Sequence, residues 1–253
     1  MTTPRDLIVV AMDVPPDLLV DRGDLSLALA GAELIDLIAA KELTLRGDRV
    51  VPVPRPEGER RTADRLLGEA LTAYETATRS AEAADRDPGR ATDKATEKAA
   101  GEAADRPTGK RAEPAAESGA DDNPGERVED WLWRRGRDLP TAYIAALEED
   151  GTLVPERHRR WGLLPTSRRV LADTPGRRRA AQHWASDAPV LRALATLIGV
   201  KGDEPPPDEV PTGSPSRVVL RALRHAVEEL AEERRLRTTR LDRANATYRS
   251  RGY

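Results

Sequence analysis

The segment from Leu25 to Ala40, LSLALAGAELIDLIAA, constrains the fold more than any other part of the chain. Its only polar side chains are Ser26, Glu33 and Asp36, so a helix over these residues is apolar on nearly all sides. Such a helix has to be surrounded by other elements. We therefore expect a core helix here, with Asp24 as the residue that caps its start.

Three shorter patterns lie around this segment. Leu7 to Met12 is an apolar run that is ambiguous between a strand and a buried helix. Leu43 to Val53 has two strand-like halves around Gly47, which predicts a β-hairpin. Arg61 to Arg79 places its apolar side chains on one side of a helix, which predicts an amphipathic helix.

The middle of the chain has a different composition. Residues 80–126 contain no Leu, Ile, Val, Met or aromatic residue, so they have nothing to bury. This composition predicts a disordered, low-complexity insert. Residues 1–79 and 127–247 are then expected to be the two parts of one domain.

The second half of the chain predicts mainly helices. They span Val128 to Arg137, Leu139 to Glu149, Arg177 to Val200 and Ser216 to Thr247. Thr152 to Val154 and Trp161 to Leu164 are expected to pair as a hairpin, with Val170 and Leu171 at its edge. The predicted fold class is mostly α: a single globular helical domain with one or two small peripheral β-hairpins and a disordered insert.

Composition limits the function classes. The chain has no Cys, which excludes disulfides, zinc–thiolate sites and a cysteine nucleophile, and favours a reducing cytoplasm. No run approaches the ~20 apolar residues of a membrane span, and the N-terminus lacks the pattern of a signal peptide. Residues 127–253 carry 24 Lys and Arg against 18 Asp and Glu, whereas residues 1–126 are acidic. A surface for an anionic partner is therefore expected in the second half.

No residue pattern indicates a reaction. The histidines His158, His183 and His225 lie on three different predicted elements, without the spacing of a metal site. Phosphate-binding loops, dinucleotide-binding turns and nucleophile elbows are absent from the sequence. We expect no catalytic residue, no metal and no cofactor.

Arginines gather in two places in the stretch from Val128 to Asp173. Arg134, Arg135 and Arg137 end a predicted helix that begins with acidic residues, an arrangement that complements the helix dipole. The same guanidinium groups suit a phosphate. Residues 157–160 form a basic turn directly before a tryptophan. Such surfaces face water, an anionic membrane or nucleic acid, and composition leaves these alternatives open.

Four segments, taken in order, resemble the Golgi phosphoprotein 3 family. They are DRGDLSLALAGAELIDLIAAKELTLRGDRVV, RLLGEALTAY, VEDWLWRRGRDLPTAYIAALEEDGTL and GLLPTSRRVLAD. The composition is similar to that of actinobacterial relatives of this family. The resemblance implies a mostly helical domain with peripheral hairpins. Eukaryotic members bind phosphatidylinositol 4-phosphate at the Golgi membrane and link it to protein partners.

The resemblance also implies a site. The family's lipid pocket uses a Trp before the core helix, an Arg within it, and two arginines three apart on a later helix. The corresponding positions here are Asp21, Ala30, Arg137 and Pro140. Arg137 alone matches the family residue. Arg22, Arg134 and Arg135 lie beside these positions and are expected to complete an arginine pocket for a lipid headgroup.

We therefore expect a peripheral protein of the cytoplasm, at the inner face of the membrane, that binds anionic, phosphoinositide-like headgroups. The first alternative is a protein-interaction scaffold that uses the 80–126 insert and the last helix. The second is a winged-helix-like regulator with the Leu139 to Glu149 helix in the major groove. That helix is acidic and has few base-reading side chains, so nucleic acid is not expected as a partner.

Overall fold

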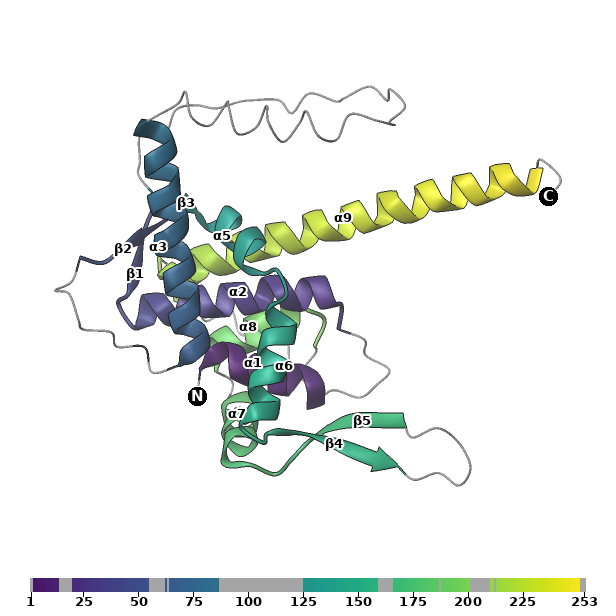
Figure 1. The fold of residues 1–253 in the computed structure, drawn as a ribbon, viewed down its shortest axis with the longest axis horizontal. Helices are drawn as coiled ribbons and strands as arrows, with labels where there is room; N and C mark the ends of the chain where they lie inside the picture. The colour runs from purple at the N-terminus through teal and green to yellow at the C-terminus, as the bar shows by residue number, and fades with distance from the viewer. Residues whose placement is uncertain are drawn as a thin grey trace.

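The structure is a computed structural model in which helices predominate (Figure 1). It describes residues 2–13, 20–54, 62, 64–86, 125–158, 166–186, 188–200, 210–211 and 213–250. The helices are α1 (Thr3–Asp13), α2 (Arg22–Ala39), α3 (Arg65–Arg86), α5 (Val128–Arg135), α6 (Leu139–Glu149), α7 (Pro175–Ala185), α8 (Pro189–Leu197) and α9 (Pro215–Ser250). The strands are β1 (Leu43–Arg46), β2 (Arg49–Pro52), β3 (Glu126–Arg127), β4 (Leu153–His158) and β5 (Thr166–Leu171).

Helix α2 is the core helix that the sequence predicts. It contacts α1, α3, α5, α6, α8 and α9, and its residues from Leu27 to Ile35 are all buried. The predicted cap is wrong by one turn. Asp21, and not Asp24, is the N-cap, because its side chain accepts a hydrogen bond from the backbone N–H of Gly23.

Helix α1 settles the ambiguity of the first apolar run. Leu7 and Ile8 are completely buried in a helix that packs against α2, α7 and α8. Because these neighbours surround α1, its apolar run is buried as a core helix and not as a strand.

The predicted first hairpin is confirmed and gains a third strand. β1 and β2 pair antiparallel around Gly47, whose φ of 64° suits a glycine in a tight turn. β3 pairs with the other edge of β2, so a segment after residue 124 joins the sheet. The Tyr74 hydroxyl on α3 donates to the backbone carbonyl of Val50 at 2.9 Å, which ties the helix to the sheet.

The predicted insert falls mostly outside the described residues. Residues 80–86 continue helix α3, and Glu126 pairs in β3 with Arg127 beside it, so a helix and a strand extend into the two ends of the predicted insert. Residues 87–124 lie outside the described part, and the disorder predicted for them stays a prediction.

The second half contains two further corrections. β4 pairs with β5 over six residue pairs, from Leu153 with Leu171 to His158 with Thr166, whereas Trp161 to Leu164 lie outside the described residues. The helix predicted from Arg177 to Val200 is two helices, α7 and α8. Pro189 begins α8, since a proline is favoured in a first turn and disrupts a helix interior.

Helix α9 is longer than predicted and is only partly packed. Its first half lies against α2, α5 and α8, with Val219, Leu223 and Ala226 buried. Its second half extends beyond the rest of the molecule (Figure 1). The predicted fold class is confirmed: a mostly helical molecule with two small antiparallel sheets, whose core includes residues from both halves of the chain.

Candidate functional site

The candidate site lies where the turn between α5 and α6 meets the first turn of α2. Gly136 ends α5, and a Cβ atom at this position would lie 3.3 Å from the backbone oxygen of Ser26. On the other side of the turn, Arg22 Nη2 donates to Thr141 Oγ1 at 2.6 Å. The turn therefore places Arg137 close to the N-terminal end of α2, where Arg22 lies. We call this surface the Arg22–Arg137 corner.

Arg134 is held by the sheet. Its Nε and Nη2 atoms donate to the two carboxylate oxygens of Glu126 on β3, at 2.6 and 2.7 Å. Its guanidinium group also lies over the ring of Trp131, 5.2 Å from the centroid. Both partners belong to the scaffold, so Arg134 connects α5 to the sheet.

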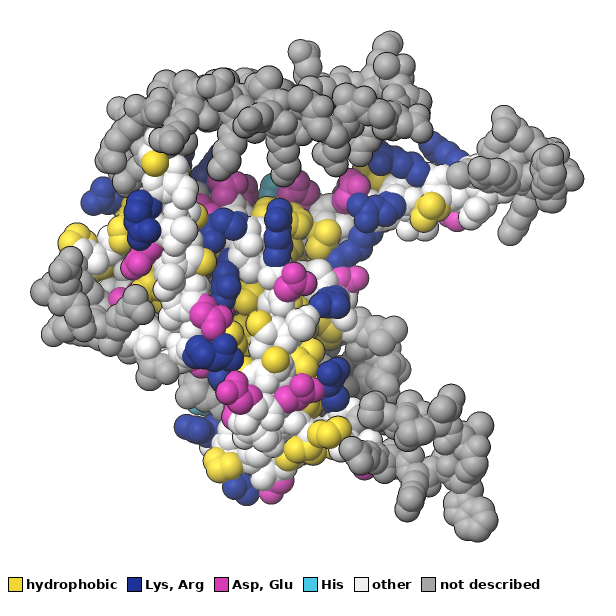
Figure 2. Space-filling model, viewed as in Figure 1, with side chains coloured by type: hydrophobic (Ala, Val, Ile, Leu, Met, Phe, Trp, Pro, Cys, Tyr) yellow, Lys and Arg dark blue, Asp and Glu magenta, His cyan; other side chains and the backbone are white. Residues whose placement is uncertain are grey.

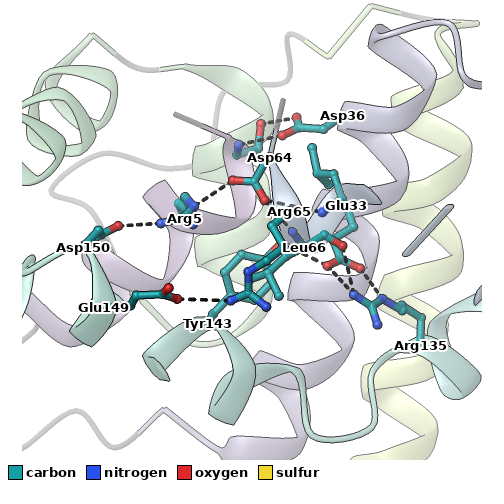
Figure 3. A network of polar contacts seen from close by, with 12 residues as sticks. Arg5, Glu33, Asp36, Asp64, Arg65, Leu66, Arg135, Tyr143, Glu149 and Asp150 are labelled. Atoms are coloured by element: carbon teal, nitrogen blue, oxygen red, sulfur yellow. Dashed lines mark hydrogen bonds and ion pairs between the residues drawn. The ribbon is translucent and has the colours of Figure 1, made fainter. Parts of the chain in front are cut away.

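Arg135 is held by the core helix. Its Nε and Nη2 atoms donate to the carboxylate of Glu33 at 2.7 and 3.0 Å, and Nη2 also reaches the backbone oxygen of Leu66 at 3.2 Å. Glu33 is completely buried, and the Tyr143 hydroxyl donates to it at 3.0 Å. Figure 3 shows these side chains converging from α2, α5 and α6.

Burial shifts the pKa of both acidic groups in this cluster, Glu33 and Tyr143. Desolvation raises the pKa of the Glu33 carboxyl above its usual value, against the opposing effects of Arg135 and the Tyr143 hydroxyl. Burial and the neighbouring Glu33 also raise the pKa of Tyr143, which therefore remains a hydrogen-bond donor. The cluster stabilises the packing of three helices, and it directs the Nε and Nη2 atoms of Arg135 to the buried Glu33 carboxylate.

The polar network continues on the far side of α2. Arg5 on α1 contacts Asp64 at 2.8 Å and Asp150 at 2.7 Å (Figure 3). Asp36 accepts from the backbone N–H and the hydroxyl of Thr3, and burial raises the pKa of this carboxyl. These contacts fasten α1, α2, α3 and α6 to one another.

An ion pair between α9 and the start of α2 lies beside the Arg22–Arg137 corner. The sequence does not indicate this pair. Arg234 on α9 donates to Asp21 at 2.5 Å and to Asp24 at 2.9 Å. Asp21, the position of the family's tryptophan, therefore caps α2 and binds α9. Burial raises the pKa of the Asp24 carboxyl, against the opposing effect of Arg234. The two carboxylates share one guanidinium group that is distant in sequence.

Two of the four predicted arginines remain at the surface. Arg137 is exposed and has no side-chain partner among the described residues. Arg22 is also exposed, and its only partner in that part of the chain is the uncharged Thr141 hydroxyl. The face in Figure 2 has basic and acidic side chains interspersed. The structure thus separates Arg22 and Arg137 from Arg134 and Arg135, whose carboxylate partners no spacing rule identifies.

The other sequence candidates are widely separated. His183 contacts the buried Asp6 at 2.7 Å, and His225 contacts Glu129 at 3.3 Å. No group of three or more potential metal ligands occurs within the described residues. The exposed end of α6 carries Glu148 and Glu149, which is unfavourable for a recognition helix.

Comparison with known families identifies the first part of the chain. The family model of Golgi phosphoprotein 3 (GPP34) matches residues 4–97. This part of the chain is therefore similar to the Golgi phosphoprotein 3 family. The match includes α1, α2, the β1–β2 hairpin and α3, and therefore Arg22 but not Arg137. A search of curated proteins gave no match.

The relation to the Golgi phosphoprotein 3 family raises the question of membrane contact. Among the helices that the structure describes, none has both the length and the apolar character needed to cross a bilayer.

Proposed function

We propose that this relative of the Golgi phosphoprotein 3 family binds anionic phospholipid headgroups peripherally through the Arg22–Arg137 corner. The observation that carries the proposal is the pair of exposed guanidinium groups without a carboxylate partner among the described residues. A guanidinium group presents parallel N–H donors that match two oxygens of a phosphate. The phosphoinositide binding of eukaryotic members of the family supports the same ligand class.

For Arg134 and Arg135 we propose a role different from the one expected from the sequence. Each makes a two-pronged ion pair with a carboxylate of the scaffold, so we propose that they position the corner rather than bind the headgroup. Arg135 is the more firmly held, because its carboxylate partner is completely buried. The proposed ligand contacts are therefore Arg137 and Arg22.

Vesicle flotation at low salt tests this function. The wild type should float with vesicles of phosphatidylcholine that contain phosphatidylinositol 4-phosphate or phosphatidylserine, and should not float with phosphatidylcholine alone. Loss of one surface cation is worth about 1 kcal/mol at an anionic membrane, so Arg137→Ala and Arg22→Ala should each weaken binding about fivefold. Rising salt should weaken the wild type as well.

Arg179→Ala is the matched control, because Arg179 is an exposed arginine on α7 without a side-chain partner among the described residues. It should leave flotation unchanged. Equal losses for Arg179→Ala and Arg137→Ala would show that net charge rather than the corner binds lipid. A wild type that stays with the phosphatidylcholine control at low salt would refute the proposal. Competition by soluble inositol phosphate distinguishes a headgroup pocket from general surface attraction.

A further inference from the structure

The second half of α9 has no packing partner among the described residues, and it extends beyond the body (Figure 1). Arg234, in the middle of α9, contacts Asp21 and Asp24 at the start of α2. From Arg235 to Ala246, every side chain that the structure describes is exposed. The part after Arg234 extends for about 24 Å at 1.5 Å per residue. An isolated helix of this length is only marginally stable in water, so a packing partner would stabilise it.

On one face of this helix, acidic side chains precede a single leucine and basic side chains follow it. Leu236 is 44% exposed. Glu229 and Glu232 lie seven and four residues before it, and Arg240 and Arg243 lie four and seven residues after it. At 3.6 residues per turn, these five side chains share one face. We call it the Leu236 face.

The Leu236 face lies to one side of the surface that α9 packs onto the body. The side chains that α9 packs onto the body are Val219, Leu223, Ala226 and Leu230. These positions lie roughly 80° to 140° around the helix from Leu236 at 100° per residue. A second helix can therefore approach the Leu236 face without meeting the core of the same molecule.

Two of the four charged side chains of this face are unpaired among the described residues. Glu229 and Arg240 are exposed and have no side-chain partner among the described residues. Glu232 reaches Arg235 of the same helix at 3.5 Å, and both side chains are more than half exposed. Figure 2 shows the basic side chains gathered on the part of α9 that projects to the right.

Exposed apolar surface lies at the acidic end of the same face. Trp133 on α5 is 38% exposed, and with Leu230 and Leu236 it lines an open hollow bordered by glutamates. The lining glutamates are Glu228, Glu229, Glu232 and Glu233. An aromatic ring beside carboxylates suits a partner helix that is both apolar and basic, as the projecting half of α9 is.

We propose that the Leu236 face binds a second copy of this chain, with the two α9 helices antiparallel and a two-fold axis at Leu236. This arrangement places Glu232 opposite Arg240 of the second copy, and Glu229 opposite Arg243. Each contact occurs twice, as in any isologous interface. A parallel arrangement would place each glutamate beside its own equivalent, so the charges specify the antiparallel one. An anionic membrane is a less suitable partner, because the glutamates at one end of the face would repel it.

Sedimentation velocity of the full chain over a wide range of protein concentration tests the proposal. The wild type should form dimers whose dissociation constant rises with salt. Glu232→Arg or Arg240→Glu places like charges opposite each other at two symmetric positions, and each should raise the dissociation constant about tenfold or more. The combined variant Glu232→Arg with Arg240→Glu restores opposite charges and should restore the dimer.

Two further variants complete the experiment. Leu236→Asp places two carboxylates at the axis and should abolish the dimer, whereas Arg179→Glu on α7 should leave it unchanged. Circular dichroism of each variant checks that the body is folded. A monomeric wild type at every concentration overturns the proposal. So does a dimer that is indifferent to both single charge reversals, or a monomer that binds anionic vesicles through Arg240.

Discussion

Arg134 and Arg135 are neighbours in sequence, yet they make ion pairs with carboxylates on different elements. Arg134 binds Glu126 on β3, and Arg135 binds the buried Glu33 on α2. A carboxylate without exposed surface depends on its cation and its hydrogen-bond donors for all of its stabilisation. At the scale of single residues, the Arg135 contact is therefore the more consequential of the two for stability.

Arg135→Met should lower the free energy of unfolding at neutral pH by about 3 kcal/mol, because it leaves a buried carboxylate without its cation. Adding Glu33→Gln should recover most of the loss, since the amide still accepts from Tyr143. Urea denaturation monitored by circular dichroism measures both effects. Arg178→Ala is the control: Arg178 pairs with Asp173 only at the surface, at 3.3 Å. It should cost less than about 1 kcal/mol.

The same variant has a defined pH dependence. Burial raises the pKa of folded Glu33 above its ordinary 4.5, so the folded chain retains a proton that the unfolded chain has released. The stability that this group provides is therefore greatest in acid and falls as pH rises through the raised pKa. Removing Arg135 raises that pKa further. The deficit of Arg135→Met should grow as pH rises above the raised pKa of Glu33 in the folded wild type; a deficit that shrinks with rising pH would contradict this assignment.

At the scale of elements, two glycines differ in whether the surrounding structure leaves room for a side chain. A Cβ atom at Gly31 in α2 would lie 3.5 Å from Leu223 and 3.6 Å from Leu132, which are ordinary contact distances. Gly125 precedes β3 with a φ of 122°, and its Cβ atom would lie 2.4 Å from the backbone oxygen of Val50. A methyl group therefore fits at Gly31, whereas at Gly125 both the lack of space and the positive φ oppose any side chain.

Gly31→Ala should raise the free energy of unfolding by about 0.5–1 kcal/mol, because alanine favours a helix interior more than glycine does. Gly125→Ala should lower it by about 2 kcal/mol, through backbone strain and a clash with β2. Thermal and urea unfolding measure both. A destabilised Gly31→Ala would show that α2 is packed more tightly than these distances indicate.

At the scale of the whole molecule, the two halves of α9 have different surroundings. Its first half completes the core against α2, α5 and α8, whereas the described side chains after Arg234 are exposed. The body should therefore not require the projecting half, which is where the second copy is proposed to bind.

Ending the chain after Arg237 should change the free energy of unfolding by less than about 1 kcal/mol, since it keeps Arg234 and every described side chain that it removes is exposed. The measurement is urea unfolding at high salt, where dimer formation does not contribute. The truncated chain should be monomeric by sedimentation velocity. A large loss of stability in the monomer would mean that the projecting half contacts the body.

How well the sequence predicts the structure at each scale depends on how far apart in the chain the interacting residues lie. The core helix, the turn at Gly47 and the last helix follow from periodicity and backbone conformation within a few residues. Two predictions are wrong because the sequence contains a second, competing signal nearby. Asp21 rather than Asp24 caps α2, and Pro189 begins a new helix inside the segment predicted as one helix. The candidate arginines were all named from sequence, but their roles were not distinguished.

By itself, the sequence determined that a central apolar helix is surrounded by others, that the chain is mostly helical, and that arginines lie near the end of α5. Only the tertiary structure decided what each arginine contacts. Arg135 meets Glu33 across 102 residues of chain, and Arg234 meets Asp21 across 213. Helix and turn formation are governed by neighbours in the chain, whereas an ion pair depends on where packing brings two distant side chains. For that reason, only the assembled helices distinguish Arg22 and Arg137, which have no carboxylate partner among the described residues, from Arg134 and Arg135.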